Sequence, residues 1–305
     1  MTLRDLHVVP VPGFGAEDVL VDNDGWVWTG TDDGSLFRIR PDGGRVLQVA
    51  RTGGRPMGLE LLPDGRVLVC DAKAGLVAVD AAGAVEVLAT CTSARGWTFL
   101  NNAAVHSSGD VLCTDSSAVH GVERWEADIA EDTHSGRLLR VAPGRDEQVL
   151  LDGLRFANGV ALTADETAVL VAETSGRRIL RHHLVGPQAG RTDELVADLP
   201  GYPDNLSRGS DGLVWAAIAS PTDPVLERLM RSPLAVRKLM WRLPSFLRPA
   251  PARTVRVMAF DDGGTLHHDV SLDASRFHMA TGVREHDGRV WLGSLLEPAV
   301  AWFEL

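Results

Sequence analysis

Residues 64–80 read DGRVLVCDAKAGLVAVD, and this stretch decides the fold prediction. It begins with an Asp-Gly turn, continues with the apolar run RVLVCD, and after a short break continues with a second such run, GLVAVD. Asp-Gly turns between short, β-branched runs are typical of antiparallel hairpins. The stretch therefore predicts neighbouring strands of one antiparallel sheet.

The same pattern recurs six times along the chain. Its turns are Asp24-Gly25, Asp64-Gly65, Ser108-Gly109, Asp165-Glu166, Asp211-Gly212 and Asp287-Gly288. The intervals between them are 40, 44, 57, 46 and 76 residues, and the first four are close to the length of a four-stranded propeller blade. We predict an all-β fold, a single six-bladed β-propeller over residues 1–305. A β-sandwich is the alternative, but a sandwich does not require six similar units.

The two ends of the chain carry complementary β-rich runs. Residues 6–11 read LHVVPV, and residues 299–305 read AVAWFEL. We expect the N-terminal run to complete the last blade, because this closes the ring and removes exposed sheet edges.

The last interval contains an insertion, at about residues 220–253, that breaks the β pattern. Its apolar residues recur at helical spacing, namely Leu226, Leu229, Met230, Leu234, Leu239, Met240 and Leu243. Between Leu226 and Arg253 there are seven basic residues and one acidic residue, a net charge of +6. One interpretation is a lid over the pocket, or a helix that contacts a membrane surface or an apolar substrate. The other is a helical pair that caps one blade, with its arginines in solvent.

Composition excludes several classes of protein. The 305 residues carry 30 basic and 41 acidic side chains, a net charge of −11, which does not suit a nucleic-acid-binding protein. A hydrophobic content of 45% is sufficient for a folded core. No stretch approaches the roughly 18 apolar residues of a membrane span, and no signal peptide is visible. We therefore expect a soluble, cytoplasmic protein.

Polar residues precede the apolar runs of several repeats. They are Glu17, Asn101, Asn102, Asn158, Asp204 and Asn205. The innermost strands of a propeller converge on a central channel, so equivalent positions in different repeats would surround one axis. Two carboxylates with several amide oxygens form a hard-oxygen site that suits Ca²⁺ better than zinc. Asn, Asp and Gly also form ordinary turns before strands, but the repetition of the whole set favours a metal site.

Several long runs resemble the strictosidine synthase-like family. They include FLNNAAVHSSGDVLCTDSS at residues 99–117, GLRFANGVALTADETAVLVAETSGRRILRHHLVGPQAG at residues 153–190, and LPGYPDNLSRGSDGLVWAA at residues 199–217. The likeness covers nearly the whole chain. The wider superfamily includes gluconolactonases and paraoxonases, which are six-bladed propellers, and its hydrolytic members carry a central divalent ion.

The resemblance implies roles for particular residues. Glu17, Asn101 and Asn158 match metal ligands of the family. Asp204 matches a ligand that is also the candidate general base or nucleophile, and Asn205 matches an additional ligand of paraoxonases. The implied cofactor is Ca²⁺ or another divalent metal.

The chain also departs from the family pattern. Asn102 stands where the hydrolases commonly have Asp. Thr281 stands at the matching position of the catalytic glutamate of strictosidine synthases, which counts against that condensation. His278 lies near this position and could move protons. Trp97 and Phe99, just before the asparagine pair, are candidates for an apolar pocket wall, together with Asn102.

These observations lead to three functional hypotheses. The first is a metal-dependent hydrolase of a lactone or ester, like a gluconolactonase or arylesterase. The second is a biosynthetic enzyme that condenses or cyclises its substrate in the same pocket. The third is a propeller that binds a ligand, with the ion in a structural role.

Overall fold

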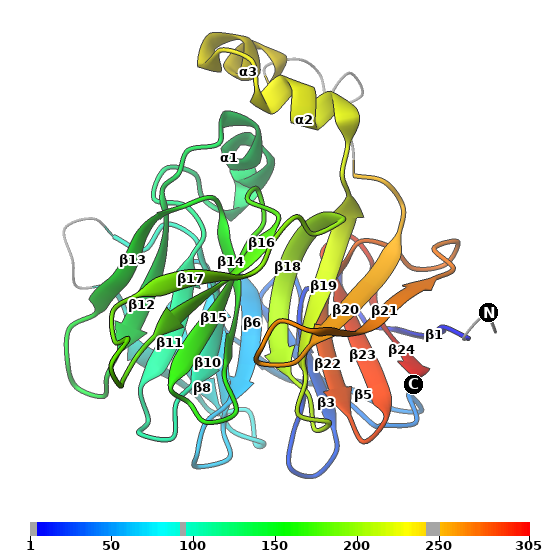
Figure 1. Cartoon of the computed structure of the whole chain (residues 1–305). Coiled ribbons are helices and arrows are strands. Elements are labelled where there is room, and N and C mark those ends of the chain that lie inside the picture. The colour runs from blue at the N-terminus through cyan, green and yellow to red at the C-terminus, as the bar shows by residue number, and fades with distance from the viewer. Residues whose placement is uncertain (1–4, 92–95, 242–250) are drawn as a thin grey trace.

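The computed structural model describes residues 5–91, 96–241 and 251–305, which form six four-stranded antiparallel sheets around a central channel (Figure 1). From the innermost to the outermost strand, the first blade consists of β2 (Val19–Val21), β3 (Val27–Gly30), β4 (Ser35–Ile39) and β5 (Val46–Arg51). The second blade consists of β6 (Pro56–Leu61), β7 (Val67–Asp71), β8 (Gly75–Val79) and β9 (Val85–Ala89). The third blade consists of β10 (Leu100–Val105), β11 (Val111–Asp115), β12 (Gly136–Val141) and β13 (Gln148–Leu154). The fourth blade consists of β14 (Ala157–Leu162), β15 (Ala168–Glu173), β16 (Arg178–His183) and β17 (Thr192–Val196). The fifth blade consists of β18 (Gly201–Arg208), β19 (Val214–Pro221), β20 (Val255–Phe260) and β21 (Leu266–Leu272). The sixth is β22 (Ala280–His286), β23 (Arg289–Ser294), β24 (Ala299–Glu304) and β1 (His7–Pro10). The prediction of a six-bladed β-propeller is confirmed.

The N-terminal strand closes the ring, as predicted. β1 pairs antiparallel with β24, in a register that runs from His7 opposite Trp302 to Pro10 opposite Ala299. The sixth blade thus combines the first and the last strand of the chain, and Figure 1 shows these two strands side by side. This pairing holds the two ends of the chain in one sheet.

Each of the six predicted turns joins the two innermost strands of a blade. Gly65, between β6 and β7, has φ +85°, a conformation that glycine adopts without steric cost. Glu166 occupies the corresponding place in the fourth blade with φ +55°. Its carboxylate accepts a hydrogen bond from the Ser107 backbone N–H at 3.2 Å, which ties this turn to the third blade.

The core consists of apolar layers between adjacent blades. Between the fifth and sixth blades, Trp215, Val257, Val283, Leu292 and Phe303 are buried together. A sheet with both faces covered needs apolar residues on consecutive positions, and β7 and β15 are accordingly buried along their whole length. The outer strand β9 is mostly exposed.

The described residues form three α-helices, and these lie at one end of the propeller (Figure 1). α2 (Pro224–Met230) and α3 (Leu234–Trp241) belong to the predicted insertion, which leaves the fifth blade after β19 and returns to it as β20. Asp223 caps α2 by accepting hydrogen bonds from the N–H groups of Val225 and Leu226, at 2.7 and 3.0 Å. Leu243, predicted as part of the same apolar set, lies outside the described residues.

The helix α1 (Trp125–Glu131) was not predicted. It follows the short 3₁₀ turn η1 (Val122–Arg124) in the connection between β11 and β12, and it contacts both α2 and α3. The long interval of 57 residues between the third and fourth turns was its signal in the sequence. None of the helices in the described ranges is long and apolar enough to cross a membrane.

Candidate metal centre

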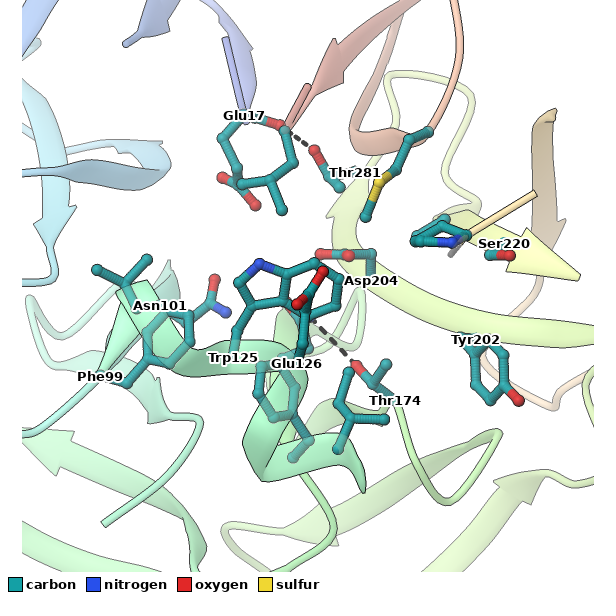
Figure 2. A pocket seen from close by; sticks show the side chains of 18 of the residues that line it. Glu17, Phe99, Asn101, Trp125, Glu126, Thr174, Tyr202, Asp204, Ser220 and Thr281 are labelled. Atoms are coloured by element: carbon teal, nitrogen blue, oxygen red, sulfur yellow. Dashed lines mark hydrogen bonds between the residues drawn. The ribbon is translucent and has the colours of Figure 1, made fainter. Parts of the chain in front are cut away.

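Residues near the start of the six innermost strands surround one end of the channel. One residue from each blade lines the same cavity: Glu17, Met57, Asn101, Asn158, Asp204 and Thr281. Figure 2 shows Glu17, Asn101, Asp204 and Thr281 around this cavity. Four of the predicted ligands are therefore brought together. Asn205, the fifth, follows Asp204 on β18, and its amide nitrogen donates to Glu17 Oε1 at 3.2 Å. The convergence of the innermost strands thus assembles residues that are up to 188 positions apart.

Four oxygens of this set have no hydrogen-bond partner in the described part of the chain. They are Glu17 Oε2, Asn101 Oδ1, Asn158 Oδ1 and Asn205 Oδ1, and all are buried. The amide nitrogens, in contrast, have hydrogen-bond partners: that of Asn101 donates to Ser116 Oγ at 2.9 Å, and that of Asn158 donates to Thr174 Oγ1 at 3.2 Å. Leaving a buried polar atom unsatisfied costs roughly 1–3 kcal/mol. Such a cluster of oxygens has the chemistry of a cation site.

The pKa values of the two cavity carboxyls, Glu17 and Asp204, also indicate a cation site. Burial, together with the charges of Asp18 and Asp204, raises the pKa of Glu17 well above its usual value, and Arg55 only partly offsets this. Burial raises the pKa of Asp204 from 3.8 to about 7, against a hydrogen bond from Asn158 that lowers it. Two buried carboxyls without a matching positive charge are unfavourable as anions. A cation held between them would remove this penalty.

The type of ligand selects the type of ion. The described residues contain no group of three or more His, Cys, Asp or Glu side chains that could hold a metal. The set instead combines two carboxylates with three amides, and oxygen donors of this kind suit a hard cation such as Ca²⁺. The residues that would hold it are Glu17, Asn101, Asn158, Asp204 and Asn205.

The residues that directly follow the six cavity residues form a second ring around the channel, which supports the cavity residues. The position after each cavity residue alternates around the channel between a polar side chain and a glycine: Asp18, Gly58, Asn102, Gly159, Asn205 and Gly282. Asn205 is not among the cavity-lining residues, but it belongs to both sets, because its amide nitrogen donates to Glu17 and its Oδ1 is one of the four unpartnered oxygens. The Asp18 carboxylate accepts a hydrogen bond from the Leu59 N–H of the second blade at 2.9 Å. A Cβ on Gly282 would lie only 2.7 Å from Asp18 Oδ1, so the glycine makes room for the neighbouring blade's polar side chain.

Asn102 belongs to this supporting ring and does not line the cavity, contrary to its prediction as a pocket residue. Its Oδ1 accepts a hydrogen bond from the Val160 N–H at 3.0 Å, which joins the innermost strands of the third and fourth blades. A Cβ on Gly58 would lie 2.6 Å from its amide nitrogen. Asn102 thus fixes the spacing between Asn101 and Asn158 on these two strands.

The remaining predicted site residues divide into two groups. Phe99 lines the cavity, as expected. Trp97 packs against the core between the second and third blades and is not among the lining residues. His278 does not line the cavity either. Its Nδ1 is hydrogen-bonded to the Glu297 carboxylate, and its Nε2 lies 3.3 Å from a guanidinium nitrogen of Arg253. The structure therefore does not bring His278 to the cation site.

The helices provide the upper wall of the cavity, which encloses about 920 Å³ including its open mouth. Most of the wall is apolar, and its large side chains are Met57, Phe99, Trp125, Ile129, Phe156, Leu226, Trp241, Met279 and Leu295. Trp125 and Glu126 of α1 line the cavity and were missed by the sequence analysis. Trp125 and Ile129, spaced four apart, were the available signal for a helical face.

Chelator-treated protein should be more stable at pH 5 than at pH 8. Because the pKa of Asp204 is raised from 3.8 to about 7, the folded state binds more protons than the unfolded state between these values, and stability rises as the pH falls. Thermal unfolding across this range measures the effect. In Asp204→Asn the dependence should be weaker, and an equal dependence in both proteins would contradict the assignment.

The fold and the site define a six-bladed β-propeller with an oxygen-rich candidate cation site at one end of its channel. A sequence model of the strictosidine synthase family matches residues 101–187, and a model of the strictosidine synthase-like N-terminal region matches residues 1–39. The adipocyte plasma membrane-associated protein of Salmo salar is 32% identical over 317 residues, which cover 92% of this chain and 73% of that protein. STRICTOSIDINE SYNTHASE-LIKE 10 of Arabidopsis thaliana is 32% identical, with coverages of 83% and 70%. The chain belongs to the strictosidine synthase-like family.

Solved structures share the propeller. A gluconolactonase from Xanthomonas campestris superposes with a TM-score of 0.71 at 16% identity, over 98% of this chain and 89% of that one. A calcium-binding regucalcin from Agrobacterium tumefaciens superposes with a TM-score of 0.66 at 14% identity, over 98% and 93%. At these identities the likeness shows a common fold.

Proposed function

We propose that this protein is a metal-dependent hydrolase of lactones or esters, with Ca²⁺ or another divalent ion held by the five predicted ligands. The observation that carries the proposal is the set of four buried, unpartnered oxygens beside two carboxyls with raised pKa values. That one structural neighbour is described as a gluconolactonase and another as calcium-binding supports the proposal.

Asp204 is the residue to which we assign the proton transfer. A bound cation would polarise the substrate carbonyl and stabilise the negative charge that develops on its oxygen. The Asp204 carboxylate accepts a proton from a water molecule as the water oxygen attacks the carbonyl carbon. The bond to the leaving oxygen then breaks, and that oxygen takes up a proton to give an alcohol. In the metal-free protein the pKa of Asp204 is raised to about 7; a bound cation would lower this pKa and keep the carboxylate ionised, as a general base must be. Direct attack by the carboxylate is the other route for the same residue.

The other polar groups of the cavity are engaged in structural bonds. Thr281 Oγ1 donates to the Glu17 carbonyl at 2.8 Å. Tyr202 OH donates to Glu227 Oε1 of α2 at 2.9 Å. Among the described residues, no side-chain base lies beside the Thr281 hydroxyl. The Tyr202 hydroxyl has the Glu227 carboxylate beside it, but burial raises the pKa of Tyr202 and keeps it protonated. Asp204 therefore remains the best-placed group for the chemistry.

The apolar wall determines how the substrate is oriented. A flexible or aromatic apolar group would lie between Phe99 and Phe156, which directly precede the inner strands β10 and β14, and the helix residues Trp125 and Leu226; all four line the cavity. The carbonyl would then face the oxygen cluster at the base. The same walls exclude water from the reacting centre, which strengthens electrostatic interactions there. We therefore expect a lactone or ester with a substantial apolar part.

The condensing alternative is less well supported by the site. The resemblance places Thr281 where strictosidine synthases have their catalytic glutamate, and here its hydroxyl is bonded to the Glu17 backbone. A threonine in this position supplies no acid–base group near neutral pH.

A panel of lactones and aryl esters, assayed with and without chelator, tests the proposal. We expect hydrolysis of at least one apolar member, lost on chelation and restored by Ca²⁺. Bound metal without hydrolysis of any member would favour the condensing enzyme. A protein that melts lower after metal removal, yet never turns over a substrate, would indicate a structural ion.

A further inference from the structure

We propose that the helical end of the propeller is a docking surface for anionic membranes, with α3 lying in the interface. The first observation is a group of apolar side chains on α2 and α3 that are exposed to solvent. Fourteen large apolar side chains are exposed in the described part of the chain, and four of them lie on α2 and α3: Val225 (60%), Leu234 (45%), Val236 (47%) and Leu239 (64%). A helix at the surface of a water-soluble domain normally turns polar residues outward.

The inner faces of these helices are already used. Leu229 of α2 is buried, and Leu226 and Trp241 line the cavity. Arg237 Nη1 donates to the backbone carbonyl of Glu131 on α1 at 2.7 Å. Val236 and Leu239 are three residues apart and therefore lie on one side of α3. They form an outward apolar face that the described residues do not cover, and Figure 1 shows α3 as the outermost element at this end.

Three further exposed apolar residues lie at the same end of the propeller. Phe14 (65%) precedes the innermost strand of the first blade, and Val119 and Leu296 lie in connections between the second and third strands of their blades. Because strands alternate in direction, all connections of these two kinds emerge at the end where Glu17 and Asp204 lie. Half of the fourteen exposed apolar side chains are thus on the face around the cavity mouth.

The charge of the two outer helices, α2 and α3, identifies the occupant, because the acidic residues of α1, namely Glu126, Asp128 and Glu131, are buried or half-buried. Residues 224–241 contain Arg228, Arg231, Arg237 and Lys238 against the single acid Glu227, in a chain with a net charge of −11. Arg228 and Arg231 are exposed, and Lys238 is exposed although its Nζ lies 3.7 Å from Glu131. Apolar residues flanked by cations are typical of segments that bind anionic lipid surfaces.

A second copy of the chain fits this face less well. A twofold interface would place the same patch of one protomer against that of the other. The cations of both helical pairs would then be close together and would repel each other. An anionic bilayer matches both the apolar and the charged components of the face, and it would place the apolar cavity next to a source of apolar molecules.

Vesicle flotation of the metal-loaded full chain tests the proposal. We expect wild-type protein to float with phosphatidylcholine vesicles that contain phosphatidylglycerol, to bind pure phosphatidylcholine less, and to be released by high salt. Val236→Ser/Leu239→Ser should reduce the bound fraction at least about tenfold, because it removes two apolar side chains from the interface. The matched control is Val85→Ser/Val87→Ser, which alters two exposed residues on β9 at the periphery and should bind like wild type.

Several results would overturn the proposal. One is wild-type protein that stays unbound with anionic vesicles. Another is equal binding of the α3 variant and the β9 control, which would make the attraction nonspecific. A third is a wild-type dimer that Val236→Ser/Leu239→Ser converts to monomer, since the face would then be covered by a second copy. Equal melting temperatures of the two variants show that both are folded.

Discussion

Asp204→Asn should abolish both metal retention and hydrolysis, with a loss of turnover of at least about a hundredfold. The substitution keeps the shape of the side chain but removes one of the two carboxylate charges that line the cavity at the ends of the innermost strands. Burial raises the pKa of this carboxyl to about 7 in the metal-free protein, so a cation and a proton compete for it. In this variant the cation would lose one of its two anionic ligands, and the attacking water would lose its base.

Glu17→Gln separates these two roles. Glu17 lies beside Asn205 and has one buried oxygen without a partner, but it is not assigned the proton transfer. This variant should lose metal affinity, and high Ca²⁺ should restore part of its activity. In Asp204→Asn, saturation with Ca²⁺ should restore none. Asp146→Asn, at an exposed position in the turn after β12, is the matched control. Wild-type metal content and turnover in both cavity variants would refute the site.

Gly159→Ala should destabilise the fold more than any single change of a ligand. A Cβ at this position would lie 2.1 Å from the Leu206 backbone nitrogen and 2.6 Å from the Asp204 carbonyl oxygen. These are main-chain atoms of the neighbouring inner strand, so the whole strand that carries Asp204 must shift. We expect a loss of several kcal/mol, in the range of overpacked cores and strained backbones, and a much lower yield of folded protein.

Thermal unfolding of Gly159→Ala against Gly212→Ala measures this effect. Gly212 has φ +81°, but a Cβ at this position would have no atom within 4 Å, so its variant reports the backbone strain without the collision. A melting temperature of Gly159→Ala at or above that of Gly212→Ala would show that the innermost strands have more room than their packing indicates.

The fold could be predicted because its signals are local and repeated. Each Asp-Gly or related turn specifies one hairpin, and six of them at blade-length spacing specify the ring. The closure by residues 6–11 followed from the same logic, since one blade lacked a strand. The helix α1 was missed because one pair of apolar residues at helical spacing, Trp125 and Ile129, is a weak signal within a long connection.

The site could be predicted in part for a related reason. Glu17, Asn101, Asn158 and Asp204 occupy equivalent positions in their blades, so the repeat places them around one axis. The orientation of side chains one residue further on is set by packing between blades, which no sequence pattern reveals. Asn102 therefore supports the ring and does not line the pocket. His278 is close to Thr281 in sequence, but its bond to Glu297 holds it away from the cavity.

Calorimetric titration of Ca²⁺ into chelator-treated protein measures whether the buried oxygens of the channel hold a cation. Because these oxygens converge on one end of the channel, we expect saturable binding of one ion per chain in the wild type. The same titration should show no comparable binding in Asp204→Asn. Absence of binding to the folded wild-type protein, or equal binding by both proteins, would contradict a cation site built from these residues.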